Sequence, residues 1–114
     1  MHELSIAQSV IHSVLNEMDR RRLSSVKKIH LRIGPWSGVM ADAVQFNFEV
    51  LRIDTPLRDT QLIIEEPPPQ GHCPQCGHAF PIQAMSLVCP QCGCESVRLQ
   101  GGDELEIASL ETGE

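Results

Sequence analysis

Two short cysteine motifs constrain this chain of 114 residues more than any other feature. Both read Cys-Pro-Gln-Cys-Gly, and twelve residues separate the second cysteine of the first from the first cysteine of the second. Each motif places two sulfurs on one tight turn, and its glycine permits the positive φ that such a turn needs. Four thiolates from two such turns form the tetrahedral S₄ set of a closed structural zinc site. The expected zinc ligands are Cys73, Cys76, Cys89 and Cys92.

The alternative for these cysteines is a pair of disulfides, which would require an oxidising compartment. The N-terminus, MHELSIAQSV, lacks the basic region and the unbroken apolar region of a signal peptide. No apolar run approaches the roughly 20 residues that span a bilayer. We therefore expect a cytoplasmic protein without a membrane partner, in which paired cysteines hold metal.

The charge of the chain argues against a nucleic-acid partner. The formal net charge is −6, and the chain has only four aromatic residues, one Trp and three Phe. Nucleic-acid binding needs a basic footprint. The one basic run, residues 20–22, is interpreted as the solvated C-terminal end of a helix, where the helix dipole stabilises cations.

The composition predicts two modules of unequal size. The segment 67–99 holds few large apolar residues and could not bury a core of its own, whereas structural zinc supplies about 10–16 kcal/mol of apparent binding free energy. Residues 67–99 are thus expected to form a zinc ribbon, entered through the stiff spacer Pro67-Pro68-Pro69. Residues 1–66 plus 100–114 are expected to form the other module.

Periodicity predicts the elements of that larger module. A helix is expected over 4–22, starting at Ser5 or one residue earlier because Ser5 and Gln8 resemble a capping box. Its apolar stripe is Leu4, Ala7, Val10, Ile11, Val14, Leu15 and Met18. A second helix is expected over 41–54, ending before Pro56, with Val44, Phe48 and Leu51 buried and Phe46 off that stripe.

Strands are expected at 26–33 and 104–111, where apolar and polar residues alternate, and at 61–66. Because the strand at 104–111 follows the zinc segment, it is expected to rejoin the sheet of the other two. The fold class is therefore α+β: two helices and a three-stranded sheet, with an inserted Cys₄ zinc ribbon. Gly34 and Gly38 bracket a shaped loop, and Trp36, Val39 and Met40 are expected either to be exposed there or to pack beneath it.

The N-terminus offers a second kind of metal ligand. The α-amine of Met1, the imidazole of His2 and the intervening amide nitrogens can form fused chelate rings. Planar nitrogen sets suit Ni(II) and Cu(II), whereas zinc prefers a tetrahedron. Any protein that begins Met-His has this feature, so the motif alone is not specific.

Three further residues lie beside the cysteine motifs. His72 and His78 flank the first motif and could replace a thiolate, donate to one, or simply be exposed. Cys94 is a fifth cysteine, read as a free thiol or a competing ligand. The sequence leaves these alternatives open.

The order of these features resembles that of the HypA/HybF family. The resemblance rests on Met-His-Glu-Leu-Ser at the start, IHLRIG, FNFEV, two CPxC motifs and the returning ELEIASLE strand. It implies a protein that binds nickel and helps to deliver it to the NiFe hydrogenase large-subunit precursor. It also implies nickel ligation by Met1, His2 and Glu3, the latter through its amide, and zinc on the four cysteines.

The implied partners are that precursor and a nickel-handling GTPase, and we also expect a weak homodimer. Two other classes of protein compete with this interpretation. One is a zinc-ribbon interaction or nucleic-acid-binding module, which predicts salt-sensitive binding to DNA or RNA and no role for the N-terminus. The other is an enzyme with catalytic zinc, which would need an open coordination position that four cysteines do not leave.

Overall fold

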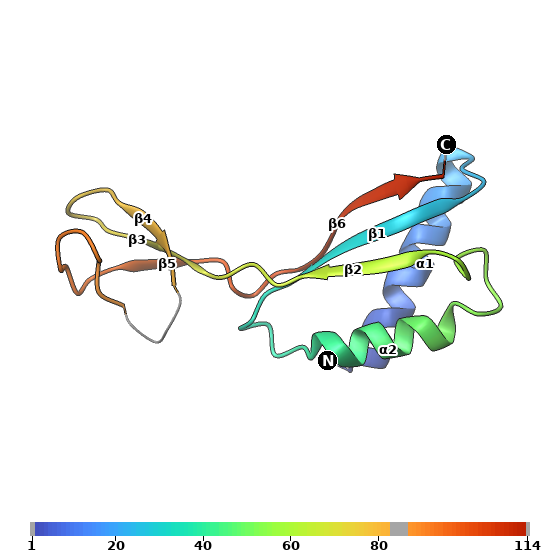
Figure 1. Ribbon diagram of the computed structural model, residues 1–114, viewed down its shortest axis with the longest axis horizontal. Coiled ribbons are helices and arrows are strands. Elements are labelled where there is room, and N and C mark those ends of the chain that lie inside the picture. The colour runs from blue at the N-terminus through green and yellow to red at the C-terminus, as the bar shows by residue number, and fades with distance from the viewer. Residues whose placement is uncertain (1, 83–86, 114) are drawn as a thin grey trace.

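The computed structural model, which describes residues 2–82 and 87–113, contains two separate sheets. The first sheet and both helices form one end of an elongated molecule, and the second sheet forms the other end (Figure 1). The principal extents are 53 × 28 × 17 Å. The predicted α+β class is therefore confirmed.

The first sheet has the strand order β2-β1-β6. The central strand β1 (Val26–Ile33) pairs in parallel with β2 (Gln61–Glu65) and antiparallel with β6 (Leu105–Thr112). All three strands were predicted to within one residue. The predicted return of the last strand to this sheet is confirmed, because Leu31 lies opposite Ile107.

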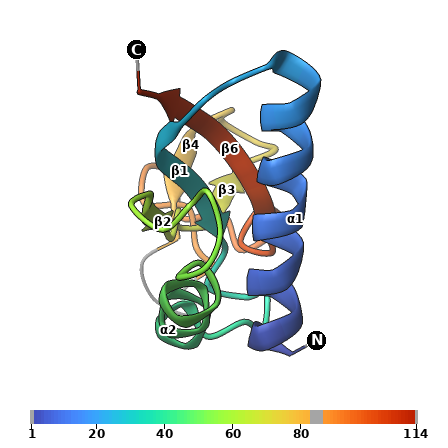
Figure 2. The same ribbon diagram turned by 90° about the vertical axis from the view of Figure 1, so that its right-hand side faces the viewer.

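Two helices, α1 (Glu3–Arg21) and α2 (Ala41–Leu51), complete this end of the molecule (Figure 2). They pack on the sheet face that carries Ile29, Leu31 and Ile33, and all three side chains are buried. The other members of this core include Val14, Val44, Phe48, Leu57 and Leu62. No helix within residues 2–82 or 87–113 combines the length and the apolar character that a membrane crossing needs.

The predicted start of the first helix is wrong. The helix begins at Glu3, and its N-cap is His2, whose side chain makes no capping hydrogen bond. Ser5 therefore lies inside the first turn rather than at a capping position. The buried stripe also differs from the predicted one, because Ile6 is buried and Leu4 is exposed.

The second helix ends three residues earlier than predicted, and turns continue the chain through residue 59. Thr60 follows these turns and is buried, and its hydroxyl donates to the carbonyl oxygen of Val26 over 2.6 Å. The Arg52 guanidinium donates to the carbonyl oxygen of Thr60. These bonds fix the approach of the chain to β2.

The second sheet is antiparallel, with the order β4-β3-β5. Its strands have three residues each: β3 (Gln70–His72), β4 (Ala79–Pro81) and β5 (Arg98–Gln100). Gly71 lies opposite Phe80, and a side chain at Gly71 would come within 2.8 Å of that ring. Such short strands bury little, so the sheet depends on what lies beside it.

The loop between β1 and α2 holds the two chain segments that join the sheets. The Trp36 N–H donates to the Gly102 carbonyl oxygen over 2.6 Å, and the Gly34 N–H donates to that of Glu104 over 2.8 Å. Gly102 has a φ of +91°, and a methyl group there would lie 2.9 Å from the Trp36 ring and 3.0 Å from Pro69. Of the two alternatives predicted for this loop, exposure is correct for Trp36 and Met40. Val39 instead packs against the core.

Replacing Gly102 by alanine will therefore displace Trp36. The substitution costs about 1–2 kcal/mol of backbone strain and adds a steric clash with the ring. Trp36 is the only tryptophan of the chain, so its fluorescence spectrum measures the displacement directly. In the control Gly38→Ala the φ is +79° but no atom lies within 4 Å, so strain should arise without a comparable spectral change. Identical spectra for wild type and Gly102→Ala would contradict the contact.

Candidate metal centres

The two cysteine motifs fold into matching turns. The N–H of Gly77 donates to the carbonyl oxygen of Cys73 over 3.0 Å, and that of Gly93 donates to Cys89 over 2.9 Å. Both glycines have positive φ values, 76° and 77°. The predicted need for glycine at these positions is thus met, because a Cβ would strain both turns.

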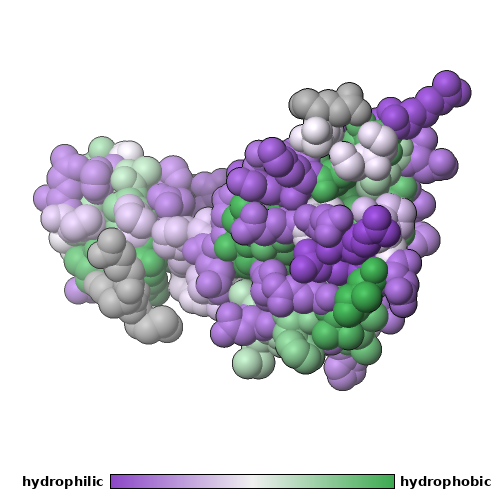
Figure 3. Space-filling model, turned by 45° about the vertical axis from the view of Figure 1, so that its right-hand side comes forward, coloured by the Kyte–Doolittle hydropathy of each residue, from purple (hydrophilic) through white to green (hydrophobic). Residues whose placement is uncertain are grey.

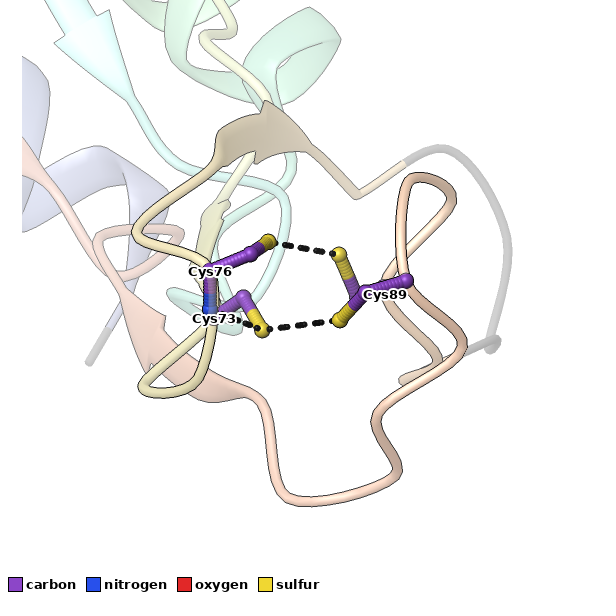
Figure 4. A group of neighbouring side chains, drawn as sticks. Cys73, Cys76 and Cys89 are labelled. Carbon is purple, nitrogen blue, oxygen red and sulfur yellow. Dashed lines mark hydrogen bonds between the residues drawn. The ribbon is translucent and has the colours of Figure 1, made fainter.

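The turns bring the sulfurs of four cysteines together, two from each motif (Figure 4). All four Sγ atoms lie within 4.8 Å of one another. The Sγ atoms of Cys73 and Cys92 are 3.4 Å apart, and those of Cys76 and Cys89 are 3.7 Å apart. A zinc–sulfur distance of about 2.3 Å in a tetrahedron requires sulfurs about 3.8 Å apart. The donor set therefore fits zinc in both chemistry and spacing.

The thiols of this cluster differ in acidity. The backbone N–H of Cys76 donates toward Cys73 Sγ over 3.5 Å and lowers the pKa of the Cys73 thiol to about 6. For Cys92, a backbone N–H at Cys94 acts to lower the pKa, but the neighbouring sulfur of Cys73 and burial outweigh it and raise the pKa to about 12. Four sulfurs this close cannot all ionise without a compensating cation, and a bound metal supplies that charge.

A small apolar cluster supports the cysteines. Cys73, Cys89 and Cys94 are buried together with Phe80 and Ile82. No other large core exists in residues 70–82 and 87–100, so four sulfurs and a few apolar side chains hold this part of the chain together. That balance agrees with a fold stabilised by metal.

The residues beside the motifs have structural positions. The carbonyl oxygen of His78 accepts the N–H of Cys73 over 3.0 Å, and that of Cys94 accepts the N–H of Cys89 over 2.9 Å. His78 and Cys94 thus occupy equivalent places in the two turns. The His78 ring stacks on Phe80 with centroids 5.7 Å apart, and His72 is exposed on β3. None of the three joins the sulfur cluster among the described residues.

Two of the predicted nickel ligands, His2 and Glu3, lie at the other end of the molecule. Met1 falls outside the described residues, whereas His2 is exposed and extended, with φ −81° and ψ 138°. Its carbonyl oxygen accepts the N–H of Ile6, which opens the first turn of α1. The first N–H groups of a helix have no acceptor within it, so the amides of His2 and Glu3 lie outside the helical ladder.

The side chain of Glu3 makes a contact that sequence reasoning missed. Its carboxylate accepts the backbone N–H of Met40 over 3.0 Å, at the N-cap of α2. This bond is the main reason that the pKa of Glu3 lies below its ordinary value. Thirty-seven positions separate the two residues, so no local pattern announces the contact.

The fold and the sulfur cluster define a small α+β protein with a four-cysteine metal-binding cluster at one end and an exposed His2 before α1 at the other. Residues 1–112 match the family described as hydrogenase/urease nickel incorporation, metallochaperone, hypA. The chain belongs to this HypA family of nickel-incorporation metallochaperones, which act in hydrogenase maturation.

Individual relatives agree with this assignment. The hydrogenase maturation factor HypA of Geobacter metallireducens is 40% identical over 97% of this chain and 98% of its own length. The hydrogenase maturation factor HypA of Chlorobaculum parvum is 38% identical over 96% of this chain and 97% of its own length. The solution structure of the Ni metallochaperone HypA from Helicobacter pylori is 25% identical, with a TM-score of 0.67, and the match covers 98% of this chain and 97% of that one.

Proposed function

We propose that this chain binds Ni(II) at its N-terminus and delivers it to the large-subunit precursor of a NiFe hydrogenase. The proposed ligands are the α-amine of Met1, the imidazole of His2, and the amide nitrogens of His2 and Glu3. The observation that carries the proposal is that His2 stands exposed in extended conformation immediately before α1. An imidazole in this position can turn toward the amides that precede the helical ladder.

An exposed chelate suits a carrier. A metal site open to solvent can exchange its ligands with those of an acceptor protein, whereas a closed S₄ cage exchanges them with difficulty. Nitrogen donors in a plane favour Ni(II), and four thiolates in a tetrahedron favour zinc. The two ends of the chain would therefore select different metals by geometry.

We assign the zinc to Cys73, Cys76, Cys89 and Cys92 as a structural metal. Bound there, zinc would neutralise the crowded thiolates and hold the two turns together. Residues 67–99 would form the zinc ribbon, and residues 1–66 with 100–114 the nickel-binding module. The separate sheets support this division.

Glu3 would act as a positioning residue for the nickel site. Its carboxylate is bonded to Met40 and is directed to the start of α2. This contact leaves the main-chain nitrogen as the ligand that Glu3 offers, and it anchors the backbone that follows His2.

The proposed partners are a nickel-handling GTPase and the hydrogenase precursor, with a weak homodimer as the free form in the cytoplasm. The protein would have no catalytic activity of its own. The net charge of −6 supports a protein acceptor rather than a nucleic acid, because phosphate backbones attract basic proteins.

Transfer of radioactive nickel tests this function directly. The chain is loaded with one equivalent of ⁶³Ni and mixed with metal-free precursor, and the two proteins are separated by size. Nickel should move to the precursor faster than it does from free nickel buffered at the same activity. Nickel that stays on the chain in the presence of both the precursor and the GTPase would contradict delivery.

Nickel release should depend steeply on pH. The proposed ligands bind only when deprotonated, so protons compete with the metal. We expect nickel affinity to fall by more than tenfold between pH 7.5 and 6, while zinc stays bound. Equilibrium dialysis with element analysis at each pH measures both metals, and parallel loss of zinc and nickel would argue against separate sites.

A further inference from the structure

Helix α2 carries a second apolar stripe that faces solvent. The side chains of Phe46, Val50 and Ile53 are 66%, 51% and 61% exposed. Their spacing is four and then three residues, and Ala43, which is half-buried, extends the series at the same interval. Residues spaced in this way lie on one face of a helix and its continuing turn.

This stripe lies opposite the one that α2 buries. Val44 and Phe48 are fully buried, and Leu51 packs against the same core. The helix is therefore apolar on two faces, and within residues 2–82 and 87–113 only the face of Val44 and Phe48 packs against the core. Figure 3 shows hydrophobic side chains gathered on the surface at α2 and surrounded by hydrophilic ones. A contiguous apolar surface of this kind marks an interaction site.

The charges beside the stripe have one sign. In heptad terms the apolar residues take the a and d positions, and the flanking positions are held by Asp42, Glu49, Asp54 and Asn47. The one cation among residues 41–54, Arg52, is turned away from the stripe. Its guanidinium bonds the Thr60 carbonyl oxygen and lies 5.7 Å from the centre of the Phe48 ring.

We propose that this face of α2 is a docking site for an amphipathic helix of another protein, with apolar residues at three- and four-residue spacing flanked by Lys and Arg. Apolar burial supplies affinity, and opposite charges at the flanks select the partner. A second copy of this chain is disfavoured as the occupant, because an α2–α2 contact would oppose acidic flanks to acidic flanks.

The position of the face has a consequence for the proposed nickel transfer. Met40 is 67% exposed and directly precedes α2, and its N–H holds the Glu3 carboxylate. A helix docked along α2 therefore lies beside the start of α1. The docking site itself does not depend on the nickel ligands, so each proposal can fail without the other.

Two synthetic helical peptides test the proposal. Both carry Leu at every a and d position over three heptads; one has Lys and the other Glu at every e and g position. Binding to the full zinc-loaded chain without nickel is followed by fluorescence anisotropy of a labelled peptide. We expect the Lys-flanked peptide to bind at least about tenfold more tightly than the Glu-flanked one. Backbone NMR shifts should map this binding to residues 42–54.

Variants of the chain separate the two contributions. Phe46→Ser with Val50→Ser removes two exposed apolar side chains and should weaken Lys-peptide binding at least about tenfold. The matched control is Leu99→Ser, at a residue 46% exposed on β5, which should bind as wild type does. Glu49→Lys with Asp54→Lys should reverse the preference toward the Glu-flanked peptide. Glu95→Lys with Asp103→Lys changes the net charge equally but should leave the preference unchanged.

Three outcomes would overturn the proposal. They are equal binding of both peptides, NMR shifts centred away from α2 in the unmodified chain, and reversal of preference by the distant charge variant. Self-association would overturn the choice of occupant if sedimentation detected a dimer that Phe46→Ser with Val50→Ser abolishes. The NMR measurement needs no variant, so a substitution that failed to fold would leave the test intact.

Discussion

Replacing Cys73 by serine will abolish zinc binding and disorder the second sheet, while the first sheet and both helices remain folded. This is the largest stability effect that we expect, because structural zinc contributes about 10–16 kcal/mol of apparent binding free energy. The second sheet has only three-residue strands and few buried apolar side chains, so it has little else to replace the contribution of the metal. Element analysis measures the zinc, and backbone NMR compares the signals of β3–β5 with those of β1.

Cys94 provides a matched control for this result. It is buried in the same cluster, but its sulfur is not among the four that converge. Cys94→Ser should therefore keep one zinc per chain, with at most a modest loss of stability from the buried hydroxyl. If Cys73→Ser retained one zinc per chain, or if Cys94→Ser lost it, the ligand assignment would be wrong.

Replacing His2 by alanine will remove tight nickel binding and leave the fold unchanged. Groups that only orient a metal ligand already contribute about 10–100-fold in affinity, so loss of a ligand should cost at least about 100-fold. His2 is exposed and its side chain makes no capping bond, so the helix should not require it. Nickel titration by calorimetry gives the affinity, and circular dichroism checks the fold.

Two comparisons isolate the N-terminal position. His12→Ala removes an exposed imidazole from the same helix and should bind nickel as wild type does. Adding Gly-Ser before Met1 keeps every side chain but removes the α-amine from the chelate, so it should weaken binding as His2→Ala does. Unchanged nickel affinity in both the His2→Ala and the extended chain would refute the N-terminal site.

A local pattern predicted β1 because this strand has one face toward solvent and one buried face. In β1 the alternation of Ile29, His30, Leu31 and Arg32 matches the observed burial. The return of β6 was predictable from chain order, since two strands alone would form a marginal sheet. The cysteine turns were also predictable from the local sequence, because their geometry depends on the spacing of the cysteines and on a glycine within a few residues.

The ends of the helices were less predictable because tertiary contacts determine them. The expected capping box at Ser5 would have left Glu3 outside the helix, but the bond from Met40 to the Glu3 carboxylate holds Glu3 at the first helical position. Residues distant in sequence make this contact, so a local pattern could not reveal it.

The site at the N-terminus is the part least accessible to pattern reasoning. Met-His alone has no specificity, and the family resemblance rather than spacing supplied the ligand set. The outer face of α2 was visible only as Phe46 lying off the predicted stripe. Only the structure shows that Val50 and Ile53 are exposed on the same face as Phe46.

The insertion of the second sheet between β2 and β6 links zinc to the stability of the first sheet through chain entropy. About 39 residues lie between these strands, and without metal they form one long flexible loop. Zinc at the proposed site would hold β3 beside β5 and leave only the short segments 66–69 and 101–104 to be closed. Loop-closure cost grows as (3/2)RT ln n, so this shortening saves about 1 kcal/mol. Loss of zinc should thus lower the melting temperature of a sheet that contains no zinc ligand.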